Sequence, residues 1–313
     1  MMFRIISTLT ILFILLTSCE TEESRGILTE HVFIVVVDGA RFSESWGDPE
    51  KKLIPNQYNY FSSNGITYNS FFNFGPTYTN AGHTALVTGN YQEIANNGSE
   101  LPKNPSIFQY WLNQTNNSNQ SAWVIASKDK LEILNNCKDS TWNNQSLAST
   151  NCGVNGLGTG YRHDTITYQN SIKILEKHYP SLVLINFREP DYSGHKNDWD
   201  GYLNGLLLTD ELIGDLLDFI DNDPVYAGTT TIFITNDHGR HLDHIKNGFV
   251  SHGDNCDGCR HIMLLASGPD FRKGIEVETV RGMTDITATV AYLMQLDMPT
   301  GTGQVMNELF RPR

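Results

Sequence analysis

Hydrophobic residues in this chain gather into short runs, separated by polar and glycine-containing segments. The run at residues 31–37 is continuous and rich in β-branched side chains. Such a run is typical of a strand buried on both faces of a parallel sheet. Similar runs lie at residues 123–126, 182–185, 229–235 and 262–266. The pattern therefore predicts five buried strands.

Between these runs, apolar residues recur at helical spacing. In residues 202–220, for example, Leu203, Leu206 and Leu207 begin a stripe that continues through Leu217, as on one face of a helix. Further helices are predicted at residues 107–113, 165–178 and 285–296. Strands that alternate with helices predict an α/β domain with a mainly parallel central sheet flanked by helices.

One stretch breaks this alternation. Residues 96–160 are rich in Asn, Ser and Gly, which favour turns and loops. We therefore expect a small cap or a long-loop insertion at about residues 90–165, within a single domain that spans residues 31–313. There is no internal repeat.

The N-terminus has the layout of a secretory signal. Arg4 precedes a short apolar run, and the run ends in Leu16-Thr-Ser-Cys19. It is shorter than the roughly 20 apolar residues of a spanning helix. The ending resembles the lipobox of bacterial lipoproteins. This predicts a signal peptide at 1–18, a lipidated Cys19, an acidic tether at 19–30, and export to the periplasm or cell surface with a lipid anchor in a bacterial membrane. An ordinary cleaved signal with an incidental cysteine is the alternative.

Charge limits the partners. The chain carries 22 Lys and Arg against 35 Asp and Glu, a formal net charge of −13, and has no extended run of basic residues. Such a chain repels nucleic acid, so no nucleic-acid partner is expected. A small anionic substrate is still compatible, because bound cations can reverse the local field.

Four cysteines remain beside Cys19. An even number in an exported protein predicts two disulfides, and we expect local pairing of Cys137 with Cys152 and of Cys256 with Cys259. Half of a zinc site is the alternative for Cys256-x-x-Cys259, although no second Cys-x-x-Cys completes it.

Acidic and histidine side chains follow the ends of several predicted strands. In open α/β sheets, ligands bind at the carboxyl ends of the strands. Carboxylate and imidazole groups together bind zinc or similar divalent ions. Each residue alone has an ordinary explanation as a helix cap or a surface side chain, but together they predict a metal site. These residues are Asp38, Asp191, His195, Asp237, His238 and His252.

Thr79 is the candidate nucleophile. Residues 81–88 are expected to form a short helix, with Thr79 and Asn80 at its N-terminus. Free backbone N–H groups and the helix dipole favour an anion there. The alternative is that one of the two residues is simply the N-cap.

Six motifs in chain order resemble those of the alkaline phosphatase superfamily, in particular its nucleotide pyrophosphatase/phosphodiesterase and phosphonoacetate hydrolase branches. They cover about residues 30–270, nearly all of the predicted domain. The motifs are Val37-Asp38-Gly39, Pro76-Thr-Tyr-Thr79-Asn80, Thr84-x-x-Val-Thr-Gly89, Asp191-x-x-Gly194-His195, Asn236-Asp237-His238-Gly239 and His252-Gly253.

The resemblance implies a site for two divalent metal ions, with zinc the expected ion. Asp191, His195 and His252 would hold one ion. Asp38, Asp237 and His238 would hold the other, in contact with Thr79 as nucleophile, and Asn80 would bind a substrate oxygen.

Three basic residues are further candidates for binding the substrate. Lys128 and Lys130 resemble a lysine pair that meets the substrate in the phosphonoacetate branch, with solvated surface lysines as the alternative. Arg41, close behind Asp38, is a candidate without a motif match.

The resemblance implies hydrolysis of phosphodiester or pyrophosphate bonds through a covalent phosphothreonine. A phosphonate hydrolase or a phosphomonoesterase on the same site is the closest alternative. A degenerate lipoprotein that binds anions or glycans is the alternative outside enzymes. No cysteine has the C/S-x-P-x-R setting of formylglycine sulfatases, which argues against that branch. The oligomeric state and the substrate stay open.

Overall fold

Strand β1 (His31–Val37) lies at the centre of the fold, and all of its residues are buried. It pairs in parallel with β5 (Leu182–Phe187) on one side and β6 (Thr230–Thr235) on the other. The computed structural model describes residues 26–312. The predicted signal peptide, Cys19 and most of the predicted tether lie outside these residues.

The central sheet has nine strands, in the order β4-β3-β5-β1-β6-β7-β2-β8, with β9 also paired to β2. From β4 to β6 all neighbours are parallel. Strand β7 runs antiparallel to both β6 and β2. The remaining strands are β2 (Ile66–Phe72), β3 (Ala122–Ala126), β4 (Ser149–Cys152), β7 (His261–Ser267), β8 (Ile275–Val277) and β9 (Arg281–Gly282). The predicted α/β fold with a mainly parallel sheet is confirmed.

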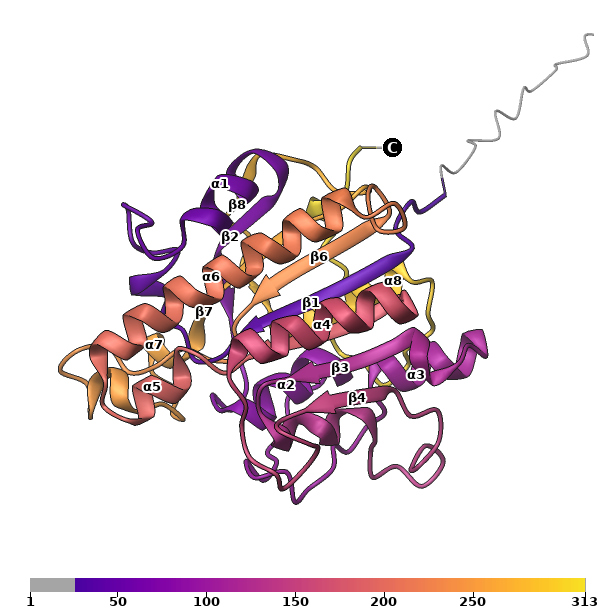
Figure 1. The fold of residues 1–313 in the computed structure, drawn as a ribbon, viewed down its shortest axis with the longest axis horizontal. Coiled ribbons are helices and arrows are strands. Elements are labelled where there is room, and N and C mark those ends of the chain that lie inside the picture. The colour runs from indigo at the N-terminus through magenta and orange to yellow at the C-terminus, as the bar shows by residue number, and fades with distance from the viewer. Residues whose placement is uncertain (1–25, 313) are drawn as a thin grey trace, which may run out of the picture.

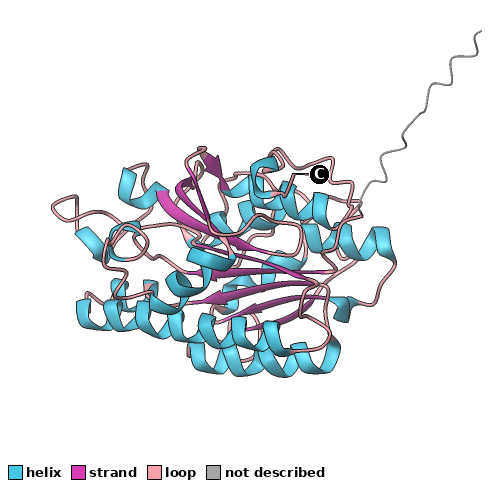
Figure 2. Ribbon diagram, turned by 90° about the horizontal axis from the view of Figure 1, so that it is seen from above, coloured by secondary structure: helices cyan, strands magenta, loops and turns pink. Residues whose placement is uncertain are grey.

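Helices cover both faces of the sheet (Figures 1 and 2). On one face, α1 (Pro55–Asn64), α4 (Asp164–His178) and α6 (Trp199–Asn222) pack on one side of β1, where Phe33 and Val35 point. On the other, α2 (Thr79–Thr88), α3 (Ile107–Thr115) and α8 (Met283–Leu293) pack on Val32 and Ile34. With both faces covered, β1 has no polar face, which explains its continuous apolar run.

Shorter helices lie in the connections. They are α5 (Asp191–His195), α7 (Asp257–Arg260) and the 3-10 turns Phe42–Glu44, Asn119–Ser121, Asp129–Asn135, Gly248–Val250 and Asn307–Leu309.

The segment 90–165 is only partly a loop insertion. It contributes α3, the edge strand β4 and its neighbour β3 to the main fold, and the rest forms two 3-10 turns and loops. Helix α1 and strand β2 were not predicted, because neither has a strong apolar period.

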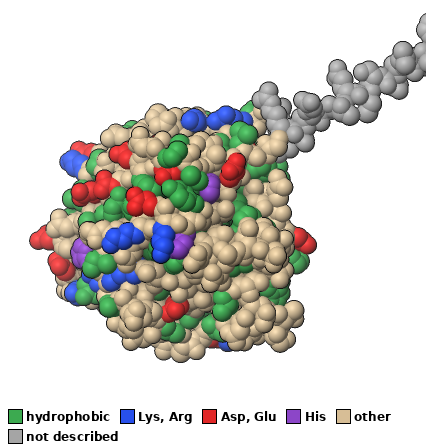
Figure 3. Space-filling model, turned by 45° about the vertical axis from the view of Figure 1, so that its right-hand side comes forward, with side chains coloured by type: hydrophobic (Ala, Val, Ile, Leu, Met, Phe, Trp, Pro, Cys, Tyr) green, Lys and Arg blue, Asp and Glu red, His purple; other side chains and the backbone are tan. Residues whose placement is uncertain are grey.

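Among residues 26–312, no helix is long and apolar enough to cross a membrane. On the face that Figure 3 shows, basic and acidic side chains are scattered among uncharged surface.

Candidate active site

The predicted metal ligands and Thr79 meet beyond the carboxyl ends of β1, β5 and β6. In Figure 1, the arrowheads of β1 and β6 point towards α5 and α7. Asp38 follows β1 directly, Asp237 follows β6 after one residue, and Asp191 begins α5 a few residues after β5. Gly39 allows the chain to turn sharply here, at φ +66°, and a Cβ on it would come within 2.7 Å of Asp191 Oδ1.

Asp191, His195 and His252 form the first ligand group. Asp191 Oδ1 lies 3.4 Å from His195 Nε2 and 3.5 Å from His252 Nε2, and the two imidazole nitrogens are 3.0 Å apart. Asp191 and His195 are the first and last residues of the helical turn α5, which places positions i and i+4 on one face. The His195 side chain is 52% exposed, so this group opens to solvent on its side.

Asp38, Asp237 and His238 form the second group, and all three are fully buried. His238 Nε2 lies 3.7 Å from Asp38 Oδ1 and 3.4 Å from Asp237 Oδ2. The rings of His238 and His252 stack with centroids 3.8 Å apart, so the two groups adjoin.

The donors of both groups suit divalent metals. His238 Nδ1 lies 2.9 Å from Gly239 O, and His252 Nδ1 lies 2.8 Å from Thr77 O. A carbonyl oxygen can only accept, so each Nδ1 carries the proton and each Nε2 presents its lone pair. Within the described residues, His238 Nε2 and Asp237 Oδ2 are buried without a hydrogen-bond partner. A bound cation would satisfy both atoms, which are otherwise costly to bury.

Titration behaviour also fits cation binding. Burial lowers the pKa of His238 and His195, and burial together with His238 lowers the pKa of His252 to about 2. The imidazoles are thus neutral at pH 7, as metal ligands must be. Burial and the neighbouring Asp237 raise the pKa of Asp38 to about 7. Two close buried carboxylates repel each other unless a cation lies between them.

Lys128 joins the two groups. Its Nζ donates to Asp38 Oδ1 at 2.7 Å, to Asp191 Oδ2 at 2.6 Å and to Thr79 Oγ1 at 3.2 Å. The side chain is buried, so it is not a solvated surface lysine. Burial alone would lower the pKa of Lys128, but Asp191 and Asp38 outweigh it and raise the pKa. The ammonium is therefore a fixed positive charge beside the Thr79 hydroxyl.

Thr79 is the first residue of α2, two residues earlier than expected. The N-cap is Tyr78, which makes no side-chain cap bond within the described residues, so neither Thr79 nor Asn80 serves as the cap. Gly82 allows the helix to approach the end of β6, since a Cβ there would lie 2.4 Å from Asp237 O. Thr77 Oγ1 donates instead to Asp254 O at 2.8 Å.

Asn80 and Lys130 meet at Asn96. Asn80 N and Lys130 Nζ both donate to Asn96 Oδ1, each at 3.0 Å, and Asn80 Nδ2 donates to Ala95 O. Lys130 is buried rather than exposed. Burial and the charge of Lys128 lower the pKa of Lys130 to about 8. Both lysines therefore lie beside the start of α2.

Comparison with known proteins assigns the family. The model of type I phosphodiesterases/nucleotide pyrophosphatases matches residues 32–242, more than half of the chain. The chain belongs to this family. It is a family of phosphoester hydrolases, and the match includes every predicted ligand except His252.

Curated relatives of this phosphodiesterase-family chain match over a shorter stretch. The phosphopentomutase of Herpetosiphon aurantiacus is 30% identical over 139 residues, 44% of this chain and 32% of that protein. The 2,3-bisphosphoglycerate-independent phosphoglycerate mutase of Nostoc punctiforme is 30% identical over 137 residues, 41% of this chain and 24% of that protein. The chain thus spans about a third or less of these relatives.

Solved structures share the fold. The phosphonate monoester hydrolase of Agrobacterium radiobacter is 12% identical with a TM-score of 0.67, over 90% of this chain and 78% of that one. Murine ectonucleotide pyrophosphatase/phosphodiesterase 5, as an inactive variant in complex with AMP, is 16% identical with a TM-score of 0.63, over 90% of this chain and 100% of that one. At these identities the likeness concerns the fold alone.

Arg41 does not join the group around Thr79 in this phosphodiesterase-family chain. Its Nε lies 2.8 Å from Glu44, its Nη1 donates to Asp243 at 3.1 Å, and its guanidinium lies over the Trp199 ring. The expectation that Arg41 faces the substrate therefore has no support from its position. Local carboxylates hold the side chain elsewhere.

Three residues at the site were not predicted as functional. Asn186 Nδ2 donates to Asp38 Oδ2 at 3.1 Å and lies 3.1 Å from His83 Nε2, while Arg240 Nη1 pairs with Asp191 Oδ1. Their positions in the sequence could have identified them as candidate site residues. Asn186 directly follows the apolar run at residues 182–185, Arg240 comes two residues after His238, and His83 lies in the Thr79 segment.

The predicted disulfides are not formed. All four cysteines that the structure describes, Cys137, Cys152, Cys256 and Cys259, are free thiols. Cys152 lies in β4, where its Sγ donates to Val124 O of the neighbouring strand at 3.5 Å. Its thiol is thus used within the sheet rather than in a bond to Cys137.

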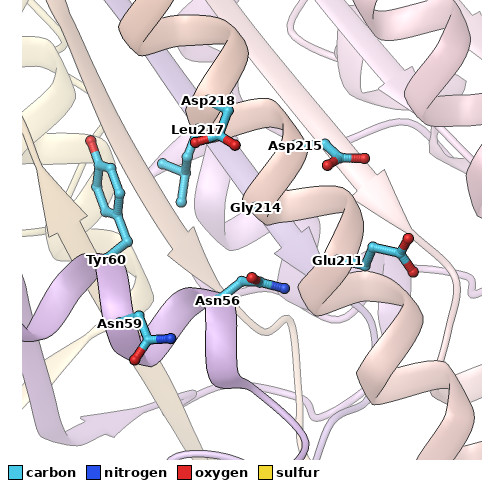
Figure 4. Close-up of a pocket in the computed structure, with 8 residues that line it drawn as sticks. All are labelled: Asn56, Asn59, Tyr60, Glu211, Gly214, Asp215, Leu217 and Asp218. Atoms are coloured by element: carbon cyan, nitrogen blue, oxygen red, sulfur yellow. The ribbon is translucent and has the colours of Figure 1, made fainter.

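A large surface cavity lies away from this site. It measures about 390 Å³ between α1 and α6 (Figure 4). No predicted site residue that the structure describes lines it. Its acidic side chains Glu211, Asp215 and Asp218 would repel an anionic substrate. The candidate active site is therefore the strand-end group, not this cavity.

Proposed function

We propose that this chain is a metal-dependent hydrolase of phosphodiester or pyrophosphate bonds, with Thr79 as nucleophile. The observation that carries the proposal is the position of Thr79 Oγ1. It lies 3.2 Å from Lys128 Nζ, which also contacts one carboxylate from each ligand group. The Thr79 hydroxyl and the Lys128 ammonium therefore lie next to both groups of candidate metal ligands.

The two ligand groups would each hold one divalent ion, and zinc is the expected ion for their carboxylate and imidazole donors. When bound, such ions lower the pKa of a contacting hydroxyl and stabilise negative charge on phosphoryl oxygens.

The chain's own residues supply the remaining chemistry. Thr79 Oγ attacks phosphorus, the bond to the leaving oxygen breaks, and a phosphothreonine forms. Water then attacks the same phosphorus and returns Thr79 as a free hydroxyl. Lys128 and the N-terminal N–H groups of α2 are proposed to stabilise the charge on the phosphoryl oxygens. Asn80 is the candidate for binding one substrate oxygen, and to do so its amide must exchange its bond to Ala95 O for one to the substrate.

The substrate is proposed to be a small anionic phosphorylated molecule. A phosphonate hydrolase or phosphomonoesterase on the same site is the second candidate, and the buried pair Lys128 and Lys130 favours it, since two cations suit a second anionic group. A degenerate site that only binds anions or glycans is disfavoured, because all six predicted metal ligands lie together.

The proposed setting is outside the cytoplasm. Lipidation at Cys19 would hold the enzyme at a bacterial membrane, and Cys19→Ser should release it or block its processing. Identical fractionation of wild type and variant into the soluble fraction would exclude the anchor.

Steady-state kinetics on bis-p-nitrophenyl phosphate, p-nitrophenyl phosphate, a phosphonate monoester and nucleotides tests the proposal. We expect the highest kcat/KM on a diester or a nucleotide pyrophosphate, and loss of that activity in Thr79→Ala. Highest kcat/KM on the monoester or the phosphonate would favour the second candidate. Absence of turnover on all four by the zinc-loaded protein would overturn the enzyme assignment.

A further inference from the structure

A second cluster of metal-ligating side chains lies outside the candidate active site. His241, Asp254, Cys256 and Cys259 each offer one ligand atom, and these atoms all lie within 4.8 Å of one another. They come from the connection between β6 and β7. The Cys-x-x-Cys pair lacked partners along the sequence, and the fold supplies them as a histidine and an aspartate.

The spacing suits a tetrahedral ion. In structural zinc sites, Zn–S bonds are about 2.3 Å and Zn–N or Zn–O bonds about 2.0 Å, so neighbouring ligand atoms lie about 3 to 4 Å apart. His241 Nε2 lies 3.1 Å from Asp254 Oδ2. The main-chain N–H of Cys259 donates to Cys256 O at 3.1 Å, and this tight turn brings both cysteines to one side.

The free atoms of the cluster point to a cation. His241 Nδ1 contacts Ser251 Oγ at 2.9 Å, while His241 Nε2 is buried and, in the described part of the chain, has no hydrogen-bond partner. Asp254 Oδ1 accepts from Cys256 N at 2.9 Å, and Oδ2 lies 3.1 Å from His241 Nε2 and 2.5 Å from Lys246 Nζ. The contacts to Ser251 and to Cys256 N orient His241 and Asp254 so that Nε2 and Oδ2 face each other, as outer contacts do around known metal sites.

We propose that His241, Asp254, Cys256 and Cys259 bind a structural zinc ion, separate from the catalytic ions. Two thiolates and one carboxylate would leave the loaded site with one net negative charge. Lys246 Nζ lies 2.5 Å from Asp254 Oδ2 and offsets that charge. Four protein ligands leave no open position for chemistry, which is the pattern of structural zinc.

The ion would clamp the segment that carries His252. His241 and Asp254 lie on either side of His252 in the chain, and Thr77 ties the same segment to α2. Thr77 Oγ1 donates to Asp254 O, and Thr77 O accepts from His252 Nδ1, both at 2.8 Å. Zinc binding would therefore fix His252 for the catalytic group. This consequence rests on the proposed function, whereas the zinc site itself does not.

A disulfide is the competing state of the same sulfurs. Its formation removes two protons and two electrons from Cys256 and Cys259, and it makes no use of His241 or Asp254. His241 Nε2 is buried and makes no hydrogen bond among residues 26–312, which favours the metal.

Cobalt substitution tests the site directly. The full-length protein is stripped of metal with a chelator under a thiol-protecting reductant and reloaded with Co²⁺. A thiolate bound to Co²⁺ gives a near-ultraviolet charge-transfer band, which oxygen and nitrogen ligands do not give. We expect the band in wild type, in Asp38→Asn/Asp191→Asn and in Cys137→Ser as the matched cysteine control. We expect its loss in Cys256→Ser/Cys259→Ser, with one zinc ion fewer per chain in the zinc-loaded protein.

The wild-type result decides the matter even if the double-cysteine variant does not fold. A wild-type protein without the band overturns the proposal. So does native, unreduced protein in which mass spectrometry finds a bond between Cys256 and Cys259. The band is independent of turnover, so an inactive protein that still gives it would refute the proposed function and leave the zinc site intact.

Discussion

The two ligand clusters of this protein differ in how the chain assembles them. The catalytic group draws Asp38, Asp191 and Asp237 from the ends of three strands that are adjacent in the sheet but distant in sequence. The cluster of His241, Asp254, Cys256 and Cys259 comes from a single connection. The sheet fixes the first group, whereas the second depends on contacts within one connection and, in our proposal, on the ion that it would bind.

The two clusters also differ in their donor atoms and in their access to solvent. The catalytic group has oxygen and nitrogen donors, a nearby hydroxyl and a solvent-facing side at His195. The other cluster has two sulfurs, four donors and no nearby nucleophile that the mechanism uses. Open positions serve catalysis, and saturated coordination serves structure.

Stepwise metal removal should separate the clusters most strongly. Mild chelation is expected to abolish turnover while about one zinc ion per chain remains, because a fully protein-ligated thiolate site releases its ion more slowly. Metal analysis and kinetics on the same samples measure this, and added zinc should restore activity. Full turnover after exhaustive chelation would contradict the metal-dependent mechanism.

Thr79→Ala should affect turnover and leave the cluster of His241, Asp254, Cys256 and Cys259 unchanged. We expect kcat to fall about 10³-fold or more, with the fold and metal content kept, because only the nucleophile is lost. Thr79→Ser should retain part of the activity.

Thr77→Ala is the matched control for this variant. Its hydroxyl binds Asp254 O rather than the Thr79 group, so its effect on kcat should be far smaller. An inactive Thr77→Ala beside an active Thr79→Ala would reverse the assignment.

Lys128→Met tests the cation that joins the two ligand groups. Since its Nζ contacts Asp38, Asp191 and Thr79, we expect kcat/KM to fall about 10²-fold, without loss of bound metal. Steady-state kinetics and metal content measure both. Unchanged kcat/KM would mean that the ammonium only neutralises the carboxylates.

Cys256→Ser/Cys259→Ser tests whether zinc binding at the second cluster affects the activity of the first. Looser placement of His252 should lower kcat/KM about 10-fold at limiting zinc, and excess zinc should restore most of it. The measurement is activity against free zinc concentration, with Cys137→Ser as the control. Equal zinc curves for all three proteins would show that the two clusters act independently.

Lys130→Met should give the smallest effect, and only at lower pH. Burial and Lys128 lower the pKa of Lys130 to about 8, so its charge is present below that pH and is lost above it. We expect KM for an anionic substrate to rise several-fold below about pH 8 and to approach the wild-type value above it. A pH profile of KM for both proteins checks this, and a pH-independent difference would remove the charge from the explanation.

Local patterns predicted much of the fold, and they selected candidate ligands that the structure brings together. The β1 run marked its bounds without error, and α3, α4, α6 and α8 were placed within three residues at every end. Asp38 and Asp237 could be chosen as candidates because they lie within two residues of the end of a buried strand, where an acidic side chain has few other structural uses. Helix α1 and strand β2 were missed, since their burial comes from neighbours rather than from their own periodicity.

The sequence by itself determined the buried strands, the donors at their ends and the Thr79 helix, because each depends on residues close together in the chain. Only the tertiary structure decided that Lys128 is buried between Asp38 and Asp191, that Arg41 is held by Glu44, and that His241 and Asp254 complete the Cys-x-x-Cys pair. These contacts depend on which loops lie next to each other. The order of the strands in the sheet decides which loops are neighbours, and local sequence patterns do not encode that order.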